Sequence, residues 1–262
     1  MGKKILILVL ALDQEPFRTI ESKGQRATWA ALPHNDYDVV WLHGRTKGFV
    51  RFILRAVVKI LQVVSSKSSI SRFRQLTGSW MASLPVNKVD DKIFTSVPET
   101  YMNTNPKTIA GLRYVLNHHD FDYLLRTNSS TYINTHLLLQ YANELPTSKY
   151  YGGFLGQHCG ENFASGTCTL LSRDVVNMIC NDPNWEYDHI DDVAIGRSLN
   201  RAGIKPQAFS RLDILTDAQL DYLSVADLQS VFVIRCKGSE SREHDLKAMH
   251  RVHDLYKENY LA

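Results

Sequence analysis

The sequence predicts an α/β fold in which a mixed, mainly parallel sheet is flanked by helices within a single domain. Residues 4–11 and 37–44 are almost continuous apolar runs, a pattern typical of strands that are buried on both faces. Helical patterns alternate with such runs along the chain, as expected where crossover helices connect parallel strands. A length of 262 residues with 44% hydrophobic residues is enough to bury a full core.

The remaining elements follow from local patterns and from residues that start or stop helices. Further strands are predicted at residues 91–97, 121–126, 150–155, 169–171 and 231–234. Helices are predicted at residues 21–31, 105–117, 135–143, 174–180, 192–202 and 241–260. Pro106 suits a first helical position, and Gly203 suits the position just after a helix. Residues 236–262 are therefore expected to form a charged helical tail.

Residues 47–90 are predicted to be an insertion in this fold. Residues 47–64 form a strongly apolar helical pattern with a basic stripe. The stripe consists of Arg51, Arg55 and Lys59. Such a helix suits an anionic membrane surface, although a core helix with a basic exposed face gives the same pattern. The Ser-rich residues 65–75, with Lys67, Arg72 and Arg74, are predicted to be a mobile loop.

Composition excludes several classes of protein. The net charge is +3 with a pI of about 8.6, and Lys and Arg are not clustered among aromatic residues, so a nucleic-acid partner is not expected. The apolar run at the N-terminus is too short to span a bilayer and lacks a cleavage site. The four cysteines show no paired metal-binding spacing, so a structural zinc site is not expected, and isolated thiols suit a reducing cytoplasm.

A short polar segment, Asn128-Ser129-Ser130, follows the strand predicted at residues 121–126. Ligands of open α/β sheets bind beyond the carboxyl ends of strands, and hydroxyl and amide groups can hydrogen-bond a sugar or a phosphate. Without a carboxylate, however, they are poor ligands for Mg²⁺ or Mn²⁺. The same three residues also suit a turn followed by a helix cap.

Two other segments are candidate parts of a site. The small residues Ala164, Ser165 and Gly166 allow the backbone to approach a ligand closely, or they form an ordinary tight loop. Asp191 and Asp192 open a helix, where the macrodipole favours negative charge. The alternative interpretation is that one of these carboxylates is a general base that deprotonates a hydroxyl nucleophile. Capping and catalysis are compatible.

Two cations follow the strand at residues 231–234. Arg235 and Lys237 would suit a diphosphate leaving group if they face the same edge of the sheet. A solvated strand end explains them equally well.

The order of these features resembles the β-1,3-glycosyltransferases of the galactosyltransferase/Fringe type, which have a GT-A fold. Five segments carry the resemblance, in order: Arg26 with Trp29; Glu99, Tyr101, Asn103, Lys107 and Thr108; residues 126–134; residues 164–166 with 171–174; and residues 191–196. The resemblance spans roughly residues 4–210, and residues 47–90 match nothing in it.

The resemblance implies transfer of a hexose or pentose from a nucleotide sugar, with UDP as the expected nucleotide, to a hydroxyl of a glycan acceptor. It implies inversion at the anomeric carbon, with Asp192 as general base and Asp191 as the second choice. The nucleotide-sugar-binding residues expected from it and from the local patterns are Arg26, Lys107, Arg126, Asn128, Ser129, Ser130, Ala164, Ser165, Gly166, Arg235 and Lys237.

The chain departs from the family at the metal site. Asn128, Ser129 and Ser130 stand where the family has an acidic DxD motif that holds Mn²⁺, and the sequence Asp120-Phe121-Asp122 lies at the start of its strand, the wrong end of the sheet. We therefore expect no metal ligands and no required cofactor, with Mn²⁺ or Mg²⁺ optional. Arg235, Lys237 or Arg126 would then neutralise the leaving group.

These features together predict a cytoplasmic enzyme, soluble or peripherally membrane-bound, of a bacterial or viral rather than a Golgi type. Two alternatives remain open. One is a catalytically inactive relative that binds a nucleotide sugar or a glycan. The other is a docking module that contacts a membrane surface or a partner through residues 47–74.

Overall fold

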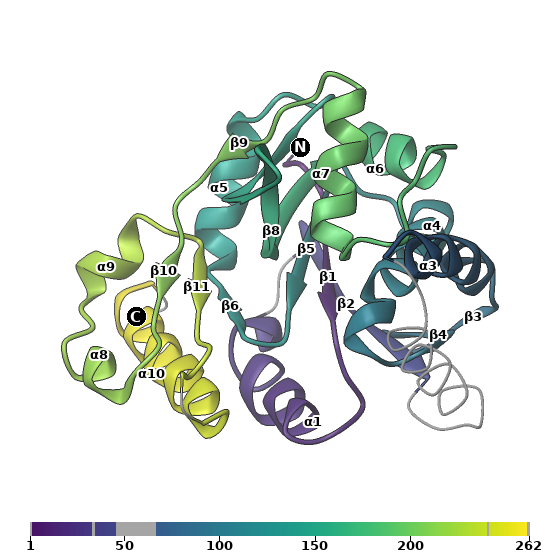
Figure 1. Cartoon of the computed structure of the whole chain (residues 1–262). Helices are drawn as coiled ribbons and strands as arrows, with labels where there is room; N and C mark the ends of the chain where they lie inside the picture. The colour runs from purple at the N-terminus through teal and green to yellow at the C-terminus, as the bar shows by residue number, and fades with distance from the viewer. Residues whose placement is uncertain (1, 33–34, 46–66, 240, 261–262) are drawn as a thin grey trace.

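A central sheet of eight strands organises the part of the chain that the computed structural model describes, residues 2–32, 35–45, 67–239 and 241–260 (Figure 1). The strand order is β3-β4-β2-β1-β5-β8-β7-β9. These strands are β1 (Ile5–Leu10), β2 (Tyr37–Arg45), β3 (Val86–Val89), β4 (Lys92–Pro98), β5 (Tyr123–Asn128), β7 (Tyr151–His158), β8 (Glu161–Ser172) and β9 (Gln207–Ala208). Strands β4, β2, β1 and β5 run parallel, whereas β8 is antiparallel to both β5 and β7. The predicted mixed, mainly parallel sheet is confirmed.

A second, three-stranded sheet lies beside the first and was only partly predicted. It consists of β10 (Leu212–Asp213), β11 (Val233–Arg235) and β6 (Thr131–Ile133), in that order. Strands of two or three residues carry no readable periodicity, so β6, β9 and β10 could not be found from sequence. Because β11 pairs antiparallel with β6, Arg235 lies opposite Thr131 and next to the polar segment that follows β5.

Helices cover both faces of the large sheet. Ile5, Ile7 and Val9 of β1 enter one apolar core and Leu6 enters another, since successive residues of a strand point to opposite faces. The first core is covered by α5 (Thr135–Glu144) and α10 (Glu243–Tyr260), and the second by α4 (Thr104–His118), α6 (Arg173–Cys180) and α7 (Asp191–Arg201). Figure 1 shows α10 grouped with α8 (Asp217–Asp221), α9 (Val225–Gln229), β10 and β11 on one side of the molecule. The C-terminal helix is thus a packed part of the core.

The helix predicted at residues 21–31 is broken in the structure. It forms α1 (Phe17–Thr19), η1 (Ile20–Gln25) and, after a turn, η2 (Trp29–Ala31). The Thr28 hydroxyl donates to the Gly24 carbonyl over 2.8 Å, and such side-chain bonds compete with regular helix hydrogen bonds. The backbone of Thr28 leaves the helical region at φ −123° and ψ −113°, which sends Trp29 into the core, where it is fully buried.

The mobile loop predicted at residues 65–75 is wrong, because residues 67–82 form α3 (Lys67–Ala82). Tertiary contacts fix this helix despite its Ser-rich sequence: the Gln75 side chain donates to the Trp185 carbonyl (2.6 Å) and accepts from the Tyr187 amide (2.7 Å). Gly78 packs so closely on Tyr187 that a β-carbon there would collide with the ring. The basic helix predicted at residues 47–64 lies outside the described residues.

Among the helices that the structure describes, none combines the length and the apolar character needed to cross a bilayer.

Candidate active site

A pocket of about 590 Å³ opens at the carboxyl ends of β1 and β5, the edge at which ligands of parallel sheets bind. It is lined by the segments that follow β1 and β4, by the turn between β5 and β6, by β8, by the start of α7, and by the segment from β11 to α10. Most of the candidate residues from sequence therefore meet in one place.

The two aspartates at the start of α7 have different surroundings. Asp191 is only 3% exposed, and its Oδ2 accepts from the Thr108 hydroxyl (2.8 Å) and forms an ion pair with the Arg126 guanidinium. Asp192 is partly exposed; its Oδ2 accepts from the Gly166 amide (2.8 Å) and its Oδ1 from the Val193 amide (2.9 Å). Asp191 is thus buried and ion-paired through Oδ2, whereas Asp192 is oriented by the backbone and is partly exposed to the pocket.

The environment of Asp192 makes its carboxylate a stronger base than an ordinary aspartate. Burial raises the pKa of Asp192, and the negative charge of Asp191 raises it further. The Arg126 charge and the two backbone amides oppose this rise without cancelling it. A carboxylate whose pKa is raised in this way inside a cleft is typical of general acid–base catalysts.

Gly166 connects Asp192 to Arg126. Its amide donates to Asp192, and its carbonyl accepts from the Arg126 guanidinium. A β-carbon at this position would collide with Arg126 and come within 3.1 Å of Asp192 Oδ2. Ser165 also lines the pocket, but Ala164 is fully buried and its amide donates to the Tyr151 hydroxyl. Glycine is therefore needed at position 166 for close packing against Arg126 and Asp192.

Asn128, Ser129 and Ser130 all line the pocket and form the tight turn between β5 and β6. Asn128 Oδ1 accepts from the Ser130 amide (3.0 Å) and from the Thr131 hydroxyl (3.1 Å), a side-chain-to-backbone turn typical of asparagine. The predicted turn is confirmed. The alternative that this segment caps a helix is wrong, because Asn134 caps α5 by accepting from the Leu137 amide.

The predicted cations fall into two groups. Lys107 is buried and donates to both oxygens of Glu99 (2.8 and 3.0 Å), and Arg126 is paired with Asp191. Arg235, by contrast, is partly exposed and lies 3.9 Å from Asp213. Lys237 is exposed, and no carboxylate among the described residues pairs with it. Of these four cations, only Arg235 and Lys237 carry a positive charge that no carboxylate among the described residues already pairs closely.

Sequence reasoning missed a further cation in this pocket, Arg242. It lies just before α10 and donates to the Ser130 hydroxyl over 2.7 Å. It also pairs with Asp245 (2.9 Å), and its guanidinium lies over the Phe17 ring. Since 112 positions separate Arg242 from Ser130, no local pattern in the sequence could have assigned it to the site.

Arg26 is not brought to the pocket. Its guanidinium makes two bonds to Asp91 (2.7 and 2.9 Å) and one to Glu21, and it stacks on the Trp41 ring. Burial alone would raise the pKa of Glu21, but the proximity of His43 (3.3 Å) and Lys92 (3.0 Å) to its carboxylate lowers this pKa to about 2. Arg26 thus belongs to a partly buried charge network that joins η1 to β2 and β4.

The DxD sequence at Asp120-Phe121-Asp122 lies at the amino ends of the strands, the opposite end of the sheet from the pocket, as predicted. Asp120 is exposed and pairs with Lys4 (3.3 Å), and Asp122 accepts from the Lys4 amide at the start of β1. These carboxylates are at the amino end of β5, so they cannot serve a ligand at its carboxyl end.

The pocket does not fit the divalent cation that the family resemblance implies. Its turn offers amide and hydroxyl oxygens, and the carboxylates of Glu99 and Asp191 are already paired with Lys107 and Arg126. The third carboxylate of the lining, Asp192, accepts from the Gly166 and Val193 amides. Across the described ranges, one group has metal-ligand spacing: Glu186, Asp188 and His189. It does not include a DxD residue, and Glu186 is paired with Arg197 over 3.1 Å.

Comparison with known proteins gives structural neighbours only. No family model matches the chain, and no curated protein matches it. Three solved structures are similar to it over most of its length. The galactosyltransferase LgtC, in complex with donor and acceptor sugar analogs, is 14% identical, with 97% of this chain and 95% of that chain covered and a TM-score of 0.46.

The mannosyltransferase PcManGT from Pyrobaculum calidifontis, in complex with GDP-Man and Mn²⁺, is 8% identical, with 99% of this chain and 71% of that chain covered and a TM-score of 0.43. The apo form of mouse xyloside xylosyltransferase 1 is also 8% identical, with 90% of this chain and 97% of that chain covered and a TM-score of 0.41. All three are glycosyltransferases by name. Because these identities and TM-scores are low, we infer function from the pocket's own chemistry.

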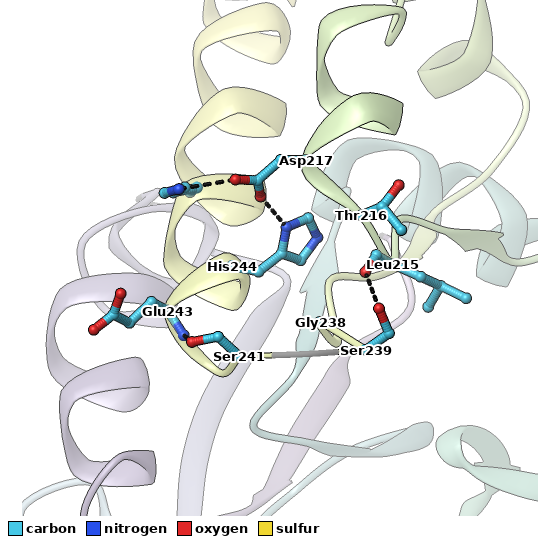
Figure 2. A pocket seen from close by; sticks show the side chains of 9 residues that line it. Leu215, Thr216, Asp217, Gly238, Ser239, Ser241, Glu243 and His244 are labelled. Atoms are coloured by element: carbon cyan, nitrogen blue, oxygen red, sulfur yellow. Dashed lines mark hydrogen bonds and ion pairs between the residues drawn. The ribbon is translucent and has the colours of Figure 1, made fainter.

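A smaller pocket of about 330 Å³ is lined by the start of α8 and the two residues before it, by Gly238, Ser239 and Ser241, and by the first turns of α10 (Figure 2). There the ring of His244 contacts Asp217 Oδ1 (2.6 Å) and the Ile214 carbonyl (3.1 Å). The Ser239 amide and hydroxyl both donate to the Leu215 carbonyl (3.1 and 3.2 Å). These contacts fix the segment between β11 and α10 against α8 and the residues before it.

Proposed function

We propose that this chain is an inverting glycosyltransferase, which moves a sugar from a nucleotide sugar, with UDP as the expected nucleotide, to a hydroxyl of a glycan acceptor. One observation carries the proposal: a single pocket holds a partly exposed carboxylate with a raised pKa together with cations and hydroxyls that have unused hydrogen-bonding capacity. Its volume, about 590 Å³, lies in the range of small-molecule sites.

The reaction needs one base, and Asp192 is the residue we assign to it. The acceptor oxygen attacks the anomeric carbon from the face opposite the diphosphate, and its proton passes to the Asp192 carboxylate. The bond between the anomeric carbon and the phosphate oxygen breaks, and its electron pair leaves with the nucleoside diphosphate. Attack from the opposite face inverts the anomeric configuration.

Asp191 has a supporting role in this proposal. Its Oδ2 is held by Thr108 and Arg126, and the residue is only 3% exposed, so it is less accessible to an acceptor than Asp192 is. Its negative charge raises the pKa of Asp192 and it fixes the guanidinium of Arg126 beneath Gly166. The structure thus favours Asp192 over Asp191 as the base.

The test is a screen for released nucleoside diphosphate. The protein is incubated with several UDP- and GDP-sugars, with and without oligosaccharide acceptors, in EDTA and in Mn²⁺. We expect slow hydrolysis of one UDP-sugar without an acceptor, and faster release with the correct acceptor. If no donor is consumed under any condition while calorimetry detects nucleotide-sugar binding, the inactive, binding-only alternative is correct.

A second candidate function concerns α3. Arg72, Leu76 and Trp80 recur every four residues along this helix and are exposed, Leu76 at 74% and Trp80 at 51%. Tryptophan is enriched where proteins meet the membrane interface, and a basic residue on the same stripe suits anionic lipid. We infer that this stripe contacts an anionic membrane surface, in keeping with the membrane partner predicted for residues 47–74.

Vesicle co-sedimentation tests this contact. The double variant Leu76→Ser/Trp80→Ser is expected to reduce binding to vesicles that contain anionic phospholipid several-fold, because it removes the apolar part of the stripe. Tyr222→Ser is the matched control, since Tyr222 is 86% exposed on α8's C-terminal side. Equal binding of wild type to neutral and anionic vesicles, or none to either, would contradict the inference.

A further inference from the structure

We propose that this chain neutralises the donor's diphosphate with its own side chains instead of a divalent cation, through a cluster formed by Ser130, Arg235, Lys237 and Arg242, called here the cation cradle. The identity of the anion as a nucleotide diphosphate rests on the proposed function. The cradle itself rests on the contacts and charges of these four residues.

A divalent cation would have to displace existing partners in this pocket. Asn128 Oδ1 is occupied by the Ser130 amide and the Thr131 hydroxyl. Glu99 and Asp191 are bound by Lys107 and Arg126 at hydrogen-bond distance, with every member of both pairs buried. Asp192, the third carboxylate that lines the pocket, already accepts from the Gly166 and Val193 amides. The hydroxyl and amide oxygens of the turn are weak ligands for a hard cation.

The cradle residues, in contrast, have unused capacity for an anion. Lys237 is exposed and has three donors, with no acidic partner among the described residues. Arg235 lies 3.9 Å from Asp213, which is too long for a strong hydrogen bond. Arg242 uses Nη2 for both Ser130 and Asp245, while its Nη1 bonds to no group among the described residues. A diphosphate would supply the missing acceptors.

The backbone brings these residues together before any ligand arrives. Arg235 pairs with Thr131 in the register of β11 and β6, and the Cys236 amide donates to the Ser130 carbonyl over 2.8 Å. The segment that carries the cations is therefore attached directly to the turn that replaces the acidic motif. The Asn128-Ser129-Ser130 turn and the cations form one unit of structure.

The far side of this segment is also held in place. The Gly238 amide donates to the buried Asp245 carboxylate over 3.0 Å. The contacts shown in Figure 2 hold Ser239 against Leu215 and, through His244, the start of α10 against Asp217. A site that folding has already ordered loses less entropy when it binds a ligand. The geometry thus favours a preformed anion site.

The same contacts exclude one of the cations expected from sequence. Arg126 is 4% exposed, and its guanidinium is taken by Asp191 and the Gly166 carbonyl. It lies with the catalytic acids, so we assign it to them and not to the cradle. Arg242 takes the place that Arg126 was expected to fill.

Calorimetry with UDP and with inorganic pyrophosphate, both in EDTA, tests the cradle. We expect wild type to bind both without metal, and Lys237→Gln and Arg242→Gln each to weaken binding about tenfold or more, as loss of a charge-assisted hydrogen bond does. Arg251→Gln, an exposed arginine on α10, is the matched control and should bind as wild type does. Lys237→Gln is the decisive variant, because its exposed side chain is not needed for folding, whereas Arg242→Gln leaves Asp245 without its cation.

Several outcomes would overturn the cradle: no binding of UDP or pyrophosphate by folded wild type in EDTA, a strict need for Mn²⁺, or unchanged binding by Lys237→Gln. Sugar transfer that requires Mn²⁺ would retain the proposed function and reject the cradle. Metal-free pyrophosphate binding that Lys237→Gln weakens, in a protein that consumes no sugar donor, would retain the cradle and reject the proposed function.

Discussion

The Asp192→Asn variant is expected to lose sugar transfer by about 10²- to 10⁴-fold, the usual contribution of a general base, while its affinity for the donor stays close to that of wild type. Asparagine keeps the shape of the side chain and can still accept from the Gly166 amide, but its amide cannot take the acceptor's proton. Steady-state kinetics measures the first effect, and calorimetry with UDP measures the second.

The matched control is Asp221→Asn, an exposed aspartate on α8, which should leave the rate unchanged. The pH dependence is a second readout. Because the pKa of Asp192 is raised by burial and by Asp191, the wild-type rate should fall on acidification at a higher pH than an ordinary carboxylate would give. If Asp192→Asn turned over at the wild-type rate, Asp192 would not be the general base.

The Lys107→Met variant is expected to lower the free energy of unfolding by about 3–5 kcal/mol, the range measured when one member of a buried ion pair is removed. Lys107 and Glu99 are each 3% exposed at the side chain. Lys107 also donates to the Ala11 carbonyl, and Glu99 accepts from the Gly44 amide. The pair therefore ties α4 to the segments that follow β1 and β4 and to β2, and the variant leaves a buried carboxylate without its cation. Urea denaturation gives the loss directly.

A double variant decides between a structural and a ligand-binding role for Lys107. Lys107→Met/Glu99→Gln removes both charges and should recover part of the lost stability. If the folded double variant binds UDP as tightly as wild type, Lys107 does not contact the nucleotide. A loss of less than about 1 kcal/mol in the single variant, the value typical of an exposed pair, would contradict the buried pair.

The sequence predicts elements whose pattern is local. β1 is recognisable in the sequence because all six of its residues are apolar, and all six are buried in the structure. α7 is recognisable because two acids begin it and Gly203, which has a φ of +75°, follows it. The helix α3 could not be predicted, because its Ser-rich sequence favours a loop and contacts with Trp185 and Tyr187, more than a hundred positions away, hold it in place.

The candidate site likewise combines features that local sequence predicts with features that depend on distant tertiary contacts. Sequence places Asp191 and Asp192 at the start of a helix, but it cannot say which one faces a ligand. That difference depends on Thr108 and Arg126, which lie 83 and 65 positions from Asp191. Arg26 failed to reach the pocket for a similar reason, since its partner Asp91 lies 65 positions away. Tertiary partners determine whether a charge is available.

Gly166 has a consequence for how the proposed enzyme can change. Because its amide orients the base and its carbonyl holds the guanidinium that fixes Asp191, any side chain there would alter both charges at once. Selection or engineering for a new acceptor through position 166 therefore cannot move the Asp192 carboxylate without also moving the Arg126 guanidinium. Substitutions that broaden specificity without loss of chemistry are therefore restricted to the rim, where residues such as Tyr101, 74% exposed at the pocket's edge, touch neither acid.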